Sequence, residues 1–427
     1  MLESTWKAQS QIKKFMRNEI WSMISFMGAP SWFITFSPAD NRHPICLYFA
    51  DTKERFSPTI RSSDECYQLI ANNPVAGAQF FHFMVETFIE HVLGVGKHHR
   101  GVYGNTSAYY GTVEQQGRLT LHLHLLLWIK GALTPQEIRD QIMDPNSEFQ
   151  QKMVEYLESV HQGEFLMGSI EEIRHNVDAA EQNKNYQPPT HTLPNPPPPS
   201  CKVKACTGCF LCWSLGIWWH KFKYTVDDLL WRSNIHECGK RCFADGYDSC
   251  KSRFPRELFE TTTVDQETGA LKMKKGEAHM NTITPILTYL LHCNTDVTSL
   301  LSGTAVKAVV AYVMEYVTKP GLKTYSIFDT IRSVFDRNSE LIGGDQKRCE
   351  KARSLLTKVV NALTAKIEIG GPMASLYLLK HSDHYTSHKF KKFYWKSYVQ
   401  VVRSVWATED DDIDKDTDKV VIGKKDD

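Results

Sequence analysis

Between residues 109 and 129 the order of apolar and polar positions is that of two neighbouring strands. The second strand is an almost continuous apolar run that ends at Ile129 and is interrupted mainly by His122 and His124. A Gln-Gly-Arg sequence at 116–118 separates the two strands, which predicts a β-hairpin. Because side chains alternate between the two faces of a strand, both histidines point to the same face.

Two imidazoles side by side in so apolar a strand need polar partners. A buried polar group without a hydrogen bond or a metal raises the free energy of the folded state. A divalent cation held by both His122 and His124 would satisfy the two rings. The hairpin also brings Glu114 or Gln116 close to the histidines. The alternative interpretation is a pair of core histidines that only hydrogen-bond within the protein.

The same periodicity predicts a short strand and three longer helices, at residues 32–37 and at 3–27, 75–93 and 308–319. In the last helix, Tyr312 and Tyr316 are spaced i,i+4 and Lys319 follows at i+7, so the three lie near one face. Two phenols beside an ammonium would suit a nucleophile pair next to a phosphate. The alternative is that both tyrosines are core aromatics.

Two polar segments are predicted to lie outside strands and helices. Asn294 and Asp296 follow a short helix opened by Pro285 and are expected in a turn. The His-rich segment at 381–388 is interpreted as an exposed polar loop rather than as a metal site.

Composition narrows the classes of protein. The 42% hydrophobic and 23% charged residues are typical of a globular chain. The sequence contains no run of about 18 apolar residues, so we predict no membrane-spanning helix. The net charge is only +1, so a nucleic-acid surface would be local. Basic clusters occur at residues 97–100, 272–275 and 389–396. The Gly-Val-Gly-Lys sequence at 94–97 lacks the spacing of a P-loop, so we expect no nucleotide site and no ATPase helicase part in this sequence.

Cysteines are concentrated in one region. Seven of the eleven lie between residues 201 and 250, at spacings typical of metal ligands rather than of disulfides. The candidate ligands are Cys201, Cys206, Cys209, Cys212, His236, Cys238, Cys242 and Cys250. We expect one or two structural Zn²⁺ sites, with free thiols as the alternative.

The motifs, taken in order, resemble the helitron helicase-like N-terminal domain, the replication-initiator part of rolling-circle transposases, which belongs to the HUH endonucleases. His122-Leu123-His124 resembles the His-hydrophobic-His signature, and Tyr312, Tyr316 and Lys319 resemble the two-tyrosine motif. Shorter resemblances lie at residues 32–38, 73–83, 250–255 and 293–296, so the likeness spans roughly residues 25–400. The usual Gly-Leu-Pro before the first histidine is replaced here by Leu119-Thr120-Leu121.

The resemblance implies an α+β fold, with an HUH-type antiparallel sheet flanked by helices and with an inserted Cys/His zinc module and extra helices. It implies a metal-dependent endonuclease and strand transferase that acts on single-stranded DNA through a 5′-phosphotyrosine intermediate. Mg²⁺ or Mn²⁺ would be held by the two histidines and a third ligand, for which Gln116 is slightly favoured over Glu114. It also implies a zinc site made of His236, Cys242 and Cys250, with Cys238 or a cysteine of the first group as fourth ligand.

The resemblance further implies a nuclear location and, because no ATPase motif is present, a separate helicase for strand displacement. Two other interpretations remain: a degenerate helitron-derived protein that binds nucleic acid without catalysis, and a zinc-stabilised interaction protein. We expect an N-terminal helix (1–30), a first core part with the His-x-His strand (31–185), a Pro-rich linker (186–200), a zinc module (201–256), a second core part with the tyrosine helix (281–345), a C-terminal helical region (346–406) and an acidic disordered tail (407–427).

Overall fold

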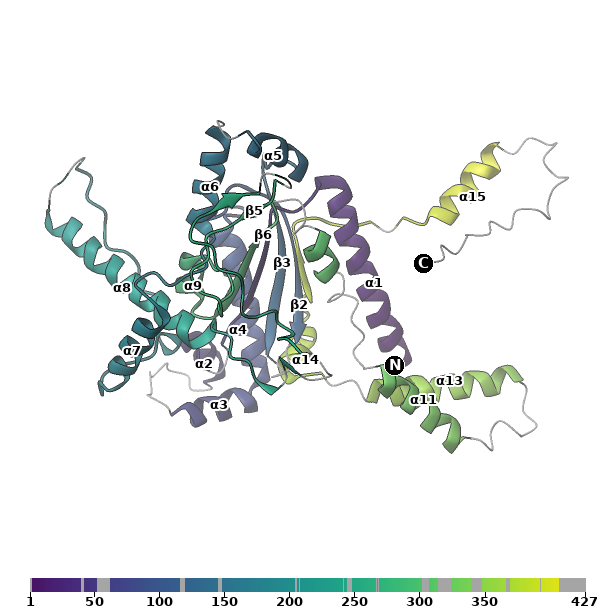
Figure 1. Ribbon diagram of the computed structural model, residues 1–427. Helices are drawn as coiled ribbons and strands as arrows, with labels where there is room; N and C mark the ends of the chain where they lie inside the picture. The colour runs from purple at the N-terminus through teal and green to yellow at the C-terminus, as the bar shows by residue number, and fades with distance from the viewer. Residues whose placement is uncertain are drawn as a thin grey trace. The chain divides into compact units, whose positions relative to one another are not determined.

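A computed structural model of the chain forms two compact units, Met1–Ser387 and His388–Asp427 (Figure 1). The second unit contains helix α15 (Trp395–Trp406), and all other elements named below belong to the first. The structure describes residues 2–39, 42–51, 62–115, 120–144, 148–203, 206, 208–240, 242–243, 248–265, 267, 269–301, 307–313, 324–338, 348–365, 369–391 and 393–406. The predicted acidic tail, 407–427, lies outside these residues.

A five-stranded antiparallel sheet forms the centre of the first unit. Its strands, in spatial order, are β6 (Asn294–Ser299), β1 (Trp32–Ser37), β3 (Leu121–Ile129), β2 (Thr106–Gln115) and β7 (His384–Thr386). The predicted hairpin is present, with β2 and β3 as its strands and β3 at the centre of the sheet. Together with the helices around the sheet, this confirms the predicted α+β class.

Both edge strands were missed by the sequence patterns. The predicted turn at Asn294 and Asp296 is wrong, because these residues begin β6 and pair with β1. The predicted polar loop is wrong at 384–386, because β7 forms there and buries Tyr385. An edge strand of three to six residues with few apolar positions shows little alternation, and its pairing depends on a distant partner.

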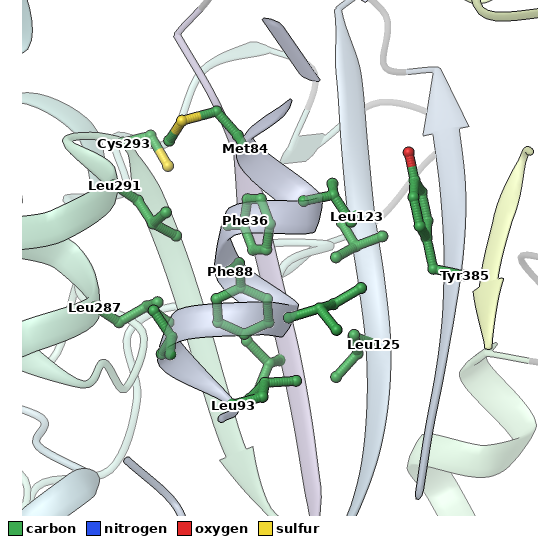
Figure 2. Close-up of a cluster of buried hydrophobic side chains, with 14 of the residues drawn as sticks. Phe36, Met84, Phe88, Leu93, Leu123, Leu125, Leu287, Leu291, Cys293 and Tyr385 are labelled. Carbon is green, nitrogen blue, oxygen red and sulfur yellow. The ribbon is translucent and has the colours of Figure 1, made fainter. Parts of the chain in front are cut away.

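One face of the sheet carries the main hydrophobic core. Phe36, Leu123 and Leu125 project from β1 and β3 towards α4 (Pro74–Thr87) and the π-helical turn Phe88–Val92 (Figure 2). Phe36 and Phe88 meet edge to face, with ring centroids 5.1 Å apart. α9 (Pro285–Leu291) closes the same core beside β6. This apolar layer fixes which side chains of β1 and β3 remain on the opposite face.

The opposite face is partly covered by α1 (Leu2–Met27), whose buried residues are Met16, Ile20 and Met23. The Tyr110 hydroxyl of β2 donates a hydrogen bond of 2.8 Å to Glu19 of this helix. Residues 307–313, also helical, lie against the same face through Tyr312. That short segment is the described part of the predicted tyrosine helix.

The first unit contains eight further α-helices among the described residues, besides the helix of the cysteine-rich region. They are α2 (Pro44–Ala50), α3 (Ser63–Asn72), α5 (Pro135–Ile142), α6 (Glu148–Val160), α7 (Ile170–Glu181), α11 (Thr324–Arg337), α13 (Arg348–Ala365) and α14 (Gly371–Leu378). A small second sheet pairs β4 (Thr263–Val264) with β5 (Leu271–Lys272). Thr134 and Glu137 form a capping box at the start of α5. No helix within the described ranges is long and apolar enough to cross a membrane.

A second core lies under α8 (Phe210–Ser233), the 24-residue helix of the cysteine-rich region. Phe222 and Val226 of α8 pack there with Ile173 of α7 and Tyr289 of α9. The predicted Pro-rich linker is attached to this core, because the Asn195 carbonyl accepts hydrogen bonds from Trp218 Nε1 and from the Tyr289 hydroxyl.

Candidate functional site

A row of five polar residues crosses the sheet face opposite the main core. The register places Asp296 of β6 opposite Thr35 of β1, Thr35 opposite His124 of β3, His124 opposite Thr112 of β2, and Thr112 opposite His384 of β7. Directly paired residues of antiparallel strands share a face, so all five point the same way. His124 therefore lies at the centre of a polar row on a rigid sheet.

A second row runs parallel to the first, two residues along each strand. It contains Asn294, Ser37, His122 and Glu114, with Asn294 paired to Ser37 and His122 paired to Glu114. The Ser37 hydroxyl is hydrogen-bonded to Nδ1 of His122. Hydrogen bonding at Nδ1 orients the ring and leaves Nε2 as the nitrogen that would act as a ligand.

His124 is buried and is held on several sides. Its Nε2 atom lies 2.9 Å from Oε2 of Glu114, in the neighbouring strand β2. The Phe33 ring stacks on the imidazole with centroids 5.9 Å apart, and the His122 ring meets it edge-on at 4.5 Å. These contacts fix the position of the ring before any ligand arrives.

His122 is held in its neutral form. Burial and the neighbouring His124 lower the pKa of His122 to about 3. A neutral imidazole is the form that binds a metal ion, so His122 requires no deprotonation near neutral pH.

The described tyrosine of the tyrosine helix lies beside the histidines. The Tyr312 ring is perpendicular to His124, with centroids 6.2 Å apart, and it also meets Phe33 edge-on at 6.0 Å. The side chain of Tyr312 is 40% exposed, so it is open to solvent while it contacts the site. A residue almost two hundred positions away in the sequence is thus placed next to the His-x-His strand.

Three predicted site residues lie outside the described residues: Gln116, Tyr316 and Lys319. Of the two candidates for the third metal ligand, the structure therefore places only Glu114, which contacts His124. The separation of 2.9 Å between the Glu114 oxygen and the histidine nitrogen is close to the ~3 Å expected between adjacent ligand atoms of an octahedral ion bound at ~2.1 Å. Two imidazoles and a carboxylate are a donor set that fits a divalent cation.

Two further sets of ligand atoms converge in the cysteine-rich region. Within each set, the sulfur or nitrogen atoms all lie within 4.8 Å of one another. Cluster 1 consists of Cys201, Cys206, Cys209 and Cys212, and cluster 2 of His236, Cys238, Cys242 and Cys250. Among the described Cys, His, Asp and Glu residues, these are the two groups of three or more that meet this distance, and the trio His122, His124 and Glu114 is looser.

The chemistry of cluster 1 fits a soft divalent metal. Hydrogen bonds from the backbone of Gly208 and Cys209 lower the pKa of the Cys206 thiol to about 6, whereas hydrogen bonding to Cys209 raises the pKa of Cys212. Thiolates are the form that binds Zn²⁺, and four of them complete a tetrahedral site. Cys209 and Cys212 also begin α8, which ties the cluster to the start of that helix.

Cluster 2 follows the end of α8. Nε2 of His236 lies 3.5 Å from Sγ of Cys242 and 3.3 Å from Sγ of Cys250. Burial raises the pKa of Cys250, but hydrogen bonds, first from the backbone of Phe254 and Ser252, outweigh it and lower the pKa to about 6. The structure thus separates the eight candidate ligands into two complete sets, with Cys238 rather than a cysteine of cluster 1 as fourth member of cluster 2.

The sequence patterns missed six polar residues of the sheet face: Thr35, Ser37, Thr112, Asn294, Asp296 and His384. Burial raises the pKa of Asp296 to about 6, against the opposing effects of Arg256 and Lys275. The alternation of Phe33, Thr35 and Ser37 could have indicated a polar face on β1, but only the pairing with β3 shows which residues they meet.

Comparison with known proteins supports the resemblance over the first part of the chain. Residues 1–127 match the family described as the helitron helicase-like domain at the N-terminus, which confirms the resemblance for that segment. The match includes β1, β2 and both histidines of β3, and it ends before Tyr312 and both cysteine clusters. No curated protein matches the chain.

Proposed function

We propose that this protein is a metal-dependent endonuclease and strand transferase of the HUH type, which acts on single-stranded DNA as in rolling-circle transposition. The observation that carries the proposal is the contact between the Tyr312 ring and His124, on the sheet face that also carries His122 and Glu114. A nucleophilic residue beside a pair of metal-ligating histidines is the arrangement that phosphoryl transfer to a tyrosine requires.

In the proposed reaction the oxygen of Tyr312 or Tyr316 attacks a DNA phosphorus. The new bond joins the phenol oxygen to phosphorus, the bond from phosphorus to the 3′ oxygen breaks, the phenol proton is released, and the 3′ oxygen takes up a proton. The products are a 5′-phosphotyrosine and a free 3′ hydroxyl, and reversal by another 3′ hydroxyl joins the strands. The phosphotyrosine keeps a phosphodiester bond, so joining needs no ATP.

The roles of the other residues follow from their contacts. A bound Mg²⁺ or Mn²⁺ would neutralise charge on the scissile phosphate. Ser37 orients His122, Phe33 supports His124, and Glu114 adds the carboxylate oxygen that hard divalent ions prefer. A free phenol has a pKa near 10, so Lys319 is proposed to supply positive charge near the nucleophile or the phosphate.

We further propose that each cysteine cluster binds one Zn²⁺ ion with a structural role. Each cluster offers four ligands, which fills a tetrahedral site and leaves no position for substrate. A nuclear location and cooperation with a separate helicase belong to the same proposal.

Two observations favour a second candidate, a helitron-derived protein that binds DNA without cutting it. The ligand atoms of His122, His124 and Glu114 are less tightly gathered than those of either cysteine cluster, and Tyr312 also contacts Phe33 as a packing aromatic would. In that case the sheet face would keep its shape but hold no ion.

A nicking assay distinguishes the two candidates. Labelled single-stranded DNA is incubated with the full chain and Mn²⁺, and protein–DNA adducts are resolved under denaturing conditions. We expect an adduct that needs the metal and is lost in the Tyr312→Phe/Tyr316→Phe double variant. DNA binding without any adduct in the wild type would contradict the endonuclease proposal and support the second candidate.

A further inference from the structure

The first half of α8 carries an exposed aromatic stripe. Phe210, Trp213 and Ile217 follow one another at i, i+3 and i+7, so they lie on one side of the helix, and their exposed fractions are 74%, 63% and 49%. The Phe210 and Trp213 rings are neighbours, with centroids 6.0 Å apart. His220 and Lys221, both exposed, continue the same side.

This stripe contributes nothing to either core. The buried residues of α8 are Phe222, Val226, Asp227, Asp228, Leu229 and Leu230, all in its second half. Trp218 faces the second core and packs on Phe222 and Tyr289. Two large aromatic rings in water raise the free energy of the folded chain and are typical of a surface with a partner.

The charge around the stripe indicates the chemistry of that partner. Residues 182–226 contain five lysines and no Asp or Glu, although Asp and Glu make up 49 of the 427 residues of the chain. Four thiolates around one divalent ion would add a net charge of −2 in cluster 1, so the region stays positive. A lysine-containing segment without acidic residues that also carries exposed aromatic rings suits a flexible polyanion with flat apolar groups.

We propose that the exposed stripe of α8 binds single-stranded DNA, with bases stacked on Phe210 and Trp213 and phosphates near Lys221, which lies on the same side of the helix. From Phe210 to Lys221 the helix rises ~17 Å, which matches about five stacked nucleotides. This inference rests on the proposed function in one respect, that DNA is the partner, and it adds a second DNA-binding surface apart from the His-x-His face. Stacking on aromatic rings needs no base-specific contact, so the stripe binds DNA of any sequence.

Cluster 1 has a defined part in this surface. Its ligands Cys209 and Cys212 lie at the start of α8, immediately beside Phe210 and Trp213. The first turn of an isolated helix end frays readily, because its amide groups lack partners within the helix. Metal binding at cluster 1 therefore holds the aromatic stripe in helical form.

The test measures binding of the full chain to fluorescein-labelled oligothymidylate of about 15 nucleotides without divalent cation, by fluorescence anisotropy. The Phe210→Ala/Trp213→Ala variant is expected to bind at least about tenfold more weakly, and Phe210→Tyr/Trp213→Phe to bind as the wild type does. Tyr67→Ala on α3 is the matched control, because Tyr67 is also 63% exposed, and it is expected to leave binding unchanged. Lys221→Gln is expected to reduce the salt dependence of binding.

Circular dichroism and the zinc content of each variant check that the helix and cluster 1 remain intact. Photocrosslinking to DNA with 5-iododeoxyuridine is expected to label residues 210–221. Binding by Phe210→Ala/Trp213→Ala within twofold of the wild type, or crosslinks only elsewhere, would overturn the inference.

The outcomes separate this inference from the proposed function. An aromatic variant that binds weakly, in a chain that forms no adduct, would support the stripe and contradict the endonuclease. Normal binding and normal adduct formation by the aromatic variant would contradict the stripe alone.

Discussion

The His-x-His face and the cysteine clusters are two kinds of ligand set in one chain. Each cluster draws four ligands from at most fifteen consecutive residues, and the four atoms surround one point. The sheet face draws its residues from β1, β2 and β3 and from the helical residues 307–313, and its ligands line one side only. The comparison indicates that local, closed sets hold a segment together, whereas an open set on a rigid sheet leaves room for a substrate.

The largest effect, on zinc content and local folding, is expected when a ligand of a closed set, one of the two cysteine clusters, is removed. Cys250→Ser should reduce the bound zinc from two ions per chain to one and unfold the residues around cluster 2, because a structural zinc site contributes on the order of 10 kcal/mol to local folding. Cys66→Ser is the control, since this buried cysteine lies on α3, outside both clusters. Zinc can be counted with a chromogenic chelator. Two ions per chain in the Cys250 variant would contradict the assignment of cluster 2.

Removing a metal ligand from the open set, the His-x-His face, should abolish DNA nicking but not folding. His124→Ala should lower the nicking rate by about 10²–10³-fold or more and leave DNA affinity nearly unchanged. Because His124 is buried and contacts Glu114, the variant should also lose about 1–3 kcal/mol of stability without unfolding. His384→Ala is a matched control, because His384 lies in the same cross-strand row, two strands away. The rates are compared by single-turnover nicking. An equal loss in both variants would mean that the row is needed for folding rather than for catalysis.

A smaller effect should identify the third ligand. Glu114 contacts His124, so Glu114→Ala should weaken Mn²⁺ activation by about 10–100-fold. Gln116→Ala, two residues further along, should change it little. Titration of nicking activity with Mn²⁺ compares the two variants. The opposite ranking would return the role to Gln116 and leave Glu114 as a partner that only orients His124.

The smallest effect concerns histidines on the core side of the sheet. Burial, and for His43 also the neighbouring His292, lowers the pKa of His43 to about 3, and burial lowers that of His161 to about 4. Below pH ~6.5 the unfolded chain binds protons that the folded chain does not, so each histidine should reduce stability by about 1 kcal/mol between pH 7 and pH 5.5. Urea unfolding at these pH values measures the loss, and His161→Gln should diminish it. A stability that rises as the pH falls would contradict this assignment.

Much of the open site was predictable because it depends on local spacing. The alternation in β3 placed His122 and His124 on one face, and the i,i+4 spacing placed Tyr312 on a helix face. The sequence did not show that Ser37 meets His122, because that contact depends on the register of β1 against β3. It also left the choice between Glu114 and Gln116 open, since both lie near the turn of the hairpin.

The candidate ligands of the cysteine-rich region were predictable from the sequence, but their division into two separate clusters was not. Spacing alone allowed one or two metal sites and left the fourth ligand of the second set undecided. In the structure, α8 separates the two groups, because cluster 1 lies at its beginning and cluster 2 follows its end. The partition is therefore a consequence of a 24-residue helix, whose length is about 36 Å.

The proposal that a tyrosine attacks DNA is tested most directly by identifying the residue that becomes covalently attached to DNA. The full chain is incubated with single-stranded DNA and Mn²⁺, digested with protease and nuclease, and analysed by mass spectrometry for a nucleotide on tyrosine. We expect a 5′-linked nucleotide on Tyr312 or Tyr316 that is absent without Mn²⁺ and absent in His124→Ala. Wild-type chain that binds the same DNA but carries no nucleotide on either tyrosine would contradict the proposal.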